Sequence, residues 1–89
     1  MEGGEDIRGT AEQDAATEAA ILAQLLALHP ARLSFEELLR EIAADPAEFA
    51  ERDAVERGVR DLAAAGLLRR SGDLVEPTRA ALRFSELLS

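Results

Sequence analysis

The chain has 89 residues, 18 acidic residues, ten arginines, no lysine, and a net charge of -8. A chain of this length forms one domain with a single small core. The absence of cysteine excludes disulfides and thiolate metal sites, and no apolar run approaches the roughly 20 residues of a membrane span. We therefore expect a cytoplasmic domain that does not enter the membrane.

The first helix is expected to follow an acidic, glycine-rich segment. Residues 1–10 are predicted to form a flexible tail, and residues 11–89 a single domain. Thr10, with Gln13 at capping-box spacing, predicts a helix that runs to about Leu28 and ends before Pro30. Its predicted inner face has helical spacing and consists of Ala15, Ala19, Leu22, Leu25 or Leu26, and His29.

A second helix is expected after a short extended link at residues 31–33. Ser34 and Glu37 form a capping-box pattern at its start, and Asp45-Pro46 marks its end. The residues predicted to point inward are Phe35, Leu38, Leu39 and Ile42. In the linker that follows, we expect Phe49 to be a buried apolar plug.

The third helix and a hairpin come next. The helix is predicted to start near Asp53 and to end at Gly66, where a left-handed residue is needed. Its predicted buried face is Val55, Val59, Leu62 and Ala63. Residues 67–70 and 74–76 read as strands around the turn Ser71-Gly72-Asp73. Thr78 then caps a last helix that ends near Leu88, with inward positions at Ala81, Leu82, Phe84 or Ser85, and Leu88.

The predicted order is α-β-α-α-β-β-α, a mainly α fold with a small β-hairpin wing. Three segments carry a resemblance to a known family: L-S-F-E-E-L-L at 33–39, V-x-x-L-A-A-A-G-L-L at 59–68, and R-R-S-G-D-L-V at 69–75. Over roughly residues 15–88 the chain resembles the winged helix-turn-helix superfamily, and the small MarR-like or PadR-like bacterial regulators most of all.

The resemblance implies a DNA-binding transcriptional regulator or accessory factor. In this superfamily the third helix enters the major groove and the wing contacts the DNA backbone. The implied contacts are Arg52, Arg57 and Arg60 on the third helix and Arg69, Arg70 and Ser71 in the wing. One module makes few contacts, so we expect a homodimer formed by the first and last helices, through Leu22, Leu26, Leu82 and Leu88.

The charge distribution supports a second hypothesis. Residues 51–79 carry six arginines and six acids, whereas residues 1–50 carry eleven acids and three arginines, a net charge of -8. Three acid–arginine pairs lie four residues apart on the third helix: Asp53 and Arg57, Glu56 and Arg60, and Arg57 and Asp61. The alternative is therefore an acidic interaction module that docks on a basic protein without binding DNA, through Glu36, Glu37 and Glu41.

The sequence does not favour an enzyme. His29 is the sole histidine, and the glutamates of the second helix are expected on an open face rather than in a cleft that shifts a pKa. We expect no catalytic residues, no cofactor and no metal.

Overall fold

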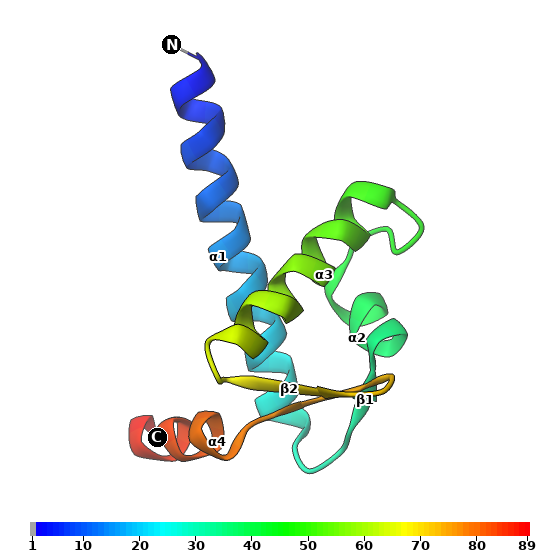
Figure 1. Ribbon diagram of the computed structural model, residues 1–89, viewed down its shortest axis with the longest axis vertical. Coiled ribbons are helices and arrows are strands. Elements are labelled where there is room, and N and C mark those ends of the chain that lie inside the picture. Colours follow the sequence, from blue (N-terminus) through cyan, green and yellow to red (C-terminus); the bar gives the residue numbers. More distant parts are fainter. Residues whose placement is uncertain (1) are drawn as a thin grey trace.

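The computed structural model describes the backbone of residues 2–89 and the side chains of residues 11–89. Within them the elements follow in the order α1 (Glu2–Leu28), β1 (Leu33–Ser34), α2 (Phe35–Ile42), α3 (Phe49–Ala64), β2 (Leu68–Ser71), β3 (Leu74–Pro77) and α4 (Arg79–Leu88) (Figure 1). The described chain is mainly helical with one small sheet, in the order that the sequence predicts.

The three strands form an antiparallel sheet with β3 in the centre. Its order is β1-β3-β2, and both Leu33 on β1 and Arg70 on β2 lie opposite Val75 of β3. Val75 is 0% exposed, so one face of the sheet is part of the core. Gly72, with a φ of +61°, forms the tight turn of the hairpin together with Asp73. The hairpin is confirmed, with β2 displaced by one residue and β3 extended to Pro77.

The predicted N-caps of α2 and α4 and the glycine after α3 are confirmed. The Ser34 hydroxyl accepts a hydrogen bond from the Glu37 amide at 3.1 Å, and the Glu37 carboxylate accepts one from the Ser34 amide at 2.8 Å. Thr78 accepts from the Ala81 amide at 3.2 Å and donates to the Gly66 carbonyl at 2.7 Å. Gly66 has a φ of +84°, the left-handed conformation that glycine adopts without strain.

The face that α1 buries agrees with the predicted one only in part. Leu25, one of the two predicted alternatives, is buried, whereas Ala15, Ala19 and His29 are exposed, and Ile21 is buried although it was not predicted. The cause lies in α3, which crosses α1 at Gly58. A Cβ built on Gly58 would lie 2.7 Å from Ile21 Cδ1, so the two helices approach closely there and Ile21 is turned inward. Leu22 and Leu26 remain half-buried beside this contact.

Other predictions about helix starts and buried positions were wrong. α1 begins at Glu2 rather than Thr10, and α3 at Phe49 rather than Asp53. α3 starts early because the Asp45 carboxylate accepts from the Ala47 amide at 3.1 Å and closes the preceding loop into a tight turn. Phe49 is therefore 79% exposed instead of buried. Ala63 and Leu88 are also exposed, and of the two predicted alternatives Phe84 is exposed whereas Ser85 is half-buried. The tail at residues 1–10 stays a prediction.

Candidate nucleic-acid and protein interfaces

Two arginines of α3 are paired with carboxylates from other helices. Arg52 pairs with Glu36 of α2. Arg57 contacts Asp53 at 2.6 Å, one turn earlier on α3, and Asp14 of α1 at 3.0 Å. The hydrogen bond to Asp14 is the main reason that the pKa of the Arg57 guanidinium is raised. Both arginines therefore fasten α3 to its neighbours.

The wing arginines lie on opposite faces of the sheet, as the alternation of a strand requires. Arg70 is on the inner side, 5.0 Å from the centre of the Phe35 ring and 3.1 Å from the Glu56 carboxylate. Arg69 is on the outer side and contacts Glu76 of β3 at 2.8 Å. This hydrogen bond lowers the pKa of Glu76, to which Arg32 also contributes from 3.7 Å.

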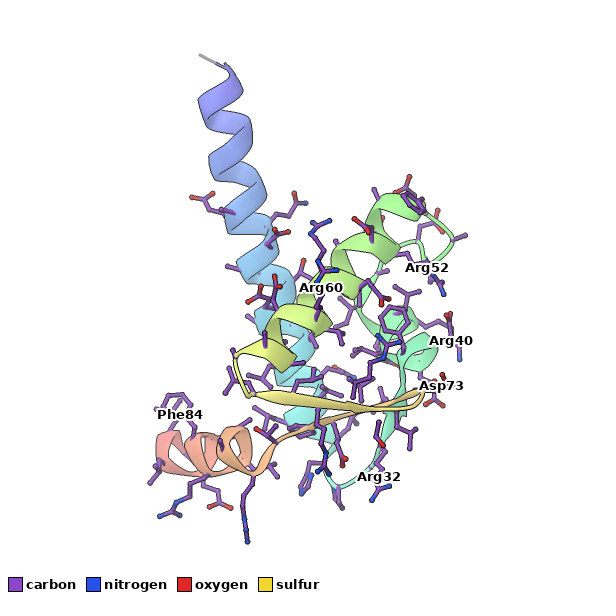
Figure 2. The ribbon with its side chains drawn as sticks, in the orientation of Figure 1. Arg32, Arg40, Arg52, Arg60, Asp73 and Phe84 are labelled. Carbon is purple, nitrogen blue, oxygen red and sulfur yellow. The ribbon has the colours of Figure 1, made fainter. Side chains whose placement is uncertain are left out.

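Among the predicted DNA contacts, Arg60 and Ser71 are not paired with a carboxylate of the described side chains. Both are exposed, and Arg60 has no carboxylate within 4.0 Å among the side chains of residues 11–89 (Figure 2). Of the three pairs predicted along α3, Asp53–Arg57 is confirmed. The other two do not form, because Glu56 pairs with Arg70 and the second contact of Arg57 goes to Asp14.

The alternative acidic site is also engaged within the fold. Glu36 pairs with Arg52, Glu37 completes the capping box of α2, and Glu41 accepts a hydrogen bond from Gln24 at 3.3 Å. α2 carries all three carboxylates, but each one has an internal partner. They do not form an unoccupied acidic patch.

Two surface hollows lie beside α1, and the sequence indicated one of them, since the residues predicted for the homodimer include Leu22, Leu26 and Leu88. An apolar groove between α1 and α4 is lined by Ala19, Leu22, Ala23, Leu26, Leu67, Ala81, Phe84, Ser85, Leu88 and Ser89. A mixed cleft between α1, the end of α2 and the first turns of α3 includes Asp14, Thr17, Ile42, Phe49, Asp53 and Arg57. Leu82, the fourth residue predicted for the homodimer, does not line the groove, and the mixed cleft was not predicted.

No protein-family model, curated protein or solved structure matches the chain. Among the described residues no helix has the length and apolar character to cross a bilayer. Within the same residues no cluster of three or more histidine, aspartate or glutamate side chains is placed to hold a metal ion.

Proposed function

We propose that this protein is a winged-helix module that acts by binding a basic protein partner rather than by reading DNA. The element order and the β1-β3-β2 sheet support the winged-helix assignment. The observation that carries the function is that the arginines of α3 and β2 that would face DNA are, apart from Arg60, held by carboxylates of the same fold.

The charge of this face can be counted from its contacts. Three arginines, Arg52, Arg57 and Arg70, meet four carboxylates, those of Glu36, Asp14, Asp53 and Glu56. Arg60 brings the sum to zero. A DNA-binding surface is normally a basic stripe, since phosphate contacts supply most of the non-specific affinity. A neutral face on a chain with a net charge of -8 favours a cationic protein instead.

DNA reading remains a second candidate because Arg60 is exposed on α3 and Ser71 is exposed at the end of β2. Both positions belong to the elements that a winged helix places against DNA. Arg52 is also exposed near the start of α3, and it lies close to the hairpin, since Arg52 and Arg70 both stand over the Phe35 ring, at 5.8 and 5.0 Å from its centre.

A salt titration separates the two functions. We expect no binding of the full chain to a labelled mixed-sequence duplex of about 30 base pairs at about 50 mM salt. The matched variant neutralises the four carboxylates as Asp14→Asn, Glu36→Gln, Asp53→Asn and Glu56→Gln, and it should gain salt-dependent binding. Micromolar binding by the wild-type chain, with a log–log salt slope of about -3 or steeper, would sink the proposed function in favour of DNA reading.

We also propose that the apolar groove between α1 and α4 pairs two copies of the chain. Phe84, Leu87 and Leu88 are 60%, 65% and 72% exposed, and no charged residue lines the groove. The same surface presents projecting side chains and a hollow, which is what a two-fold interface needs. Figure 2 places Phe84 on α4, far from Arg52 on α3, so pairing here leaves the α3 face free.

Charge supports a second copy as the occupant. Residues 11–28 of α1 carry three acids and no base, whereas α4 carries Arg79 and Arg83 against Glu86. In a two-fold pair that places α4 of each copy on α1 of the other, the basic helix therefore meets the acidic helix at two equivalent contacts.

Sedimentation equilibrium of the full chain tests the pairing. We expect a mass twice the 9.6 kDa of the monomer at micromolar concentrations, and a monomer for Phe84→Asp. Phe49→Asp is the matched control, since Phe49 is equally open but lies outside the groove. A wild-type monomer at all concentrations, or a dimer that survives Phe84→Asp, would show that the groove does not pair two copies.

A further inference from the structure

We propose that the cleft between α1 and α3 is the docking site for the basic partner, and that it takes an amphipathic helical segment with apolar side chains on one face and arginine or lysine beside them. This inference rests on the proposed function, because it names the surface and the chemistry through which the module would bind its partner.

The cleft exists because α1 and α3 cross once and then diverge. They are closest at Gly58, where α3 has no side chain and Ile21 fills the contact. Towards the start of α3 the two helices separate, as Figure 1 shows, and the end of α2 closes the bottom of the space. The opening is lined by Gln13, Asp14 and Thr17 on one side and by the first turns of α3 on the other. Its volume of about 570 Å³ accommodates several side chains of a partner helix.

One side of the cleft is apolar and open to solvent. Phe49, the first residue of α3, is 79% exposed, and it stands beside Ile42, Ala54 and Val55. Nothing within residues 11–89 covers the Phe49 ring, although burial of such a ring is strongly favourable. An exposed aromatic ring at the rim of a hollow is a typical anchor point for a partner's apolar side chain.

The cleft also has surplus negative charge, from Asp14 on α1 and from Glu51 and Asp53 on α3. Asp14, Glu51 and Asp53 line it together with one cation, Arg57, which leaves a local charge of -2. Arg57 bridges Asp14 and Asp53 and neutralises only one of them. The raised pKa of its guanidinium reflects the same excess of carboxylate around it. An incoming arginine or lysine would be attracted here, and a phosphate would be repelled.

These two properties together define the occupant. A basic segment without apolar residues would leave Phe49 uncovered, and an apolar segment without cations would bury carboxylates without partners. A helix with leucines at i and i+4 and arginines beside them meets both requirements, which is the usual arrangement of a helix in a groove.

Peptide binding to the full-length, isotope-labelled protein tests the proposal. The probe is a helical peptide of about 14 residues with leucines on one face and arginines on the other. Two control peptides replace the arginines by glutamates or the leucines by serines. We expect only the first peptide to shift the amide resonances of Thr17, Ile42, Phe49 and Ala54. Phe49→Ser should weaken its binding about tenfold or more, and the matched change Phe84→Ser should not.

Each of the following results would contradict docking of the basic partner in the cleft. If the serine control binds as tightly as the leucine peptide, the attraction is general electrostatics and no docking site exists. If the leucine peptide shifts resonances only of α4, or does not bind, the cleft is not its site. In these cases the proposed function is still judged separately by the DNA titration, so the two failures are distinguishable.

Discussion

Gly58→Ala probes the contact that sets the orientation of the two longest helices. The added Cβ would lie 2.7 Å from Ile21 Cδ1, and Ile21 is 0% exposed, so its terminal methyl can move only by displacing neighbouring core side chains. Overpacking of this kind costs about 1–3 kcal/mol. Replacing glycine by alanine inside a helix returns about 0.8–1 kcal/mol. We therefore expect a net loss of about 1 kcal/mol, or a Tm about 4–8 °C lower for a domain of this size.

A double-mutant cycle makes this prediction sharp. Ile21→Val removes the clashing methyl at a cost of about 0.5–1.5 kcal/mol. With that methyl gone, Gly58→Ala should stabilise by its helix propensity alone, so the double variant returns close to wild type and the coupling is about -2 kcal/mol. Urea unfolding followed by circular dichroism, at one fixed protein concentration, measures all four proteins. Additive effects, or a Gly58→Ala variant more stable than wild type, would refute the close approach of α1 and α3.

Two further predictions concern a cap and a pH dependence. Ser34→Ala removes the acceptor for the Glu37 amide and should cost about 1 kcal/mol in the same urea assay, whereas Ser71→Ala, at an exposed strand end, should cost almost nothing. The hydrogen bond from Arg69 lowers the pKa of Glu76 from its ordinary value of 4.5. The ionised Glu76 carboxylate therefore stabilises the fold above pH 4.5, and this stabilisation is lost as the pH falls through the lower pKa of the folded state. Glu76→Gln should therefore reduce the drop in Tm between neutral pH and pH values below 4.5, and an unchanged drop would show that this pair does not contribute to the acid sensitivity.

The local signals in the sequence were sufficient for the element order. Ser34 with Glu37, Gly66, Gly72 and Thr78 each perform the cap or turn that their spacing indicated. These signals work because each depends on atoms only two to four residues apart, which the sequence places together regardless of the rest of the fold. They also explain why the hairpin was predicted to within one residue.

The inner face of α1 could not be predicted because its sequence has apolar residues on every side. One continuous apolar stripe on α1 consists of Ala15, Ala19, Leu22 and Leu26. A second stripe contains Ile21 and Leu25. The choice between them is made by α3, whose Gly58 admits the Ile21 side chain. A glycine inside a helical pattern was therefore the overlooked signal, since it costs helix stability and is usually present for a packing reason.

The candidate site shows the same division between local and long-range information. Sequence spacing can reveal a pair such as Asp53 and Arg57. It cannot reveal that Arg57 contacts Asp14, which lies 43 positions earlier, or that Glu56 pairs with Arg70 of the hairpin. When two partners compete for one guanidinium, the geometry of the folded chain decides. Arg57 therefore keeps Asp53 but contacts Asp14 instead of Asp61, and Glu56 pairs with Arg70 instead of Arg60.

The acids around the α3 arginines weigh against DNA binding by a calculable amount. For an arginine to reach a phosphate, its carboxylate must stay behind at the interface, where it repels that phosphate. A pair of like charges 4 Å apart costs about 1 kcal/mol even in bulk water, and four carboxylates stand on this face. The total repulsion from the four carboxylates is about 4 kcal/mol, which corresponds to about a thousandfold in affinity. This is comparable with the smallest free-energy difference between specific and non-specific DNA binding. The fourfold amide variant should recover most of that factor on duplex DNA at low salt. Recovery of less than about tenfold would mean that these acids do not determine the affinity of the α3 face for DNA, and that the shape of the face does.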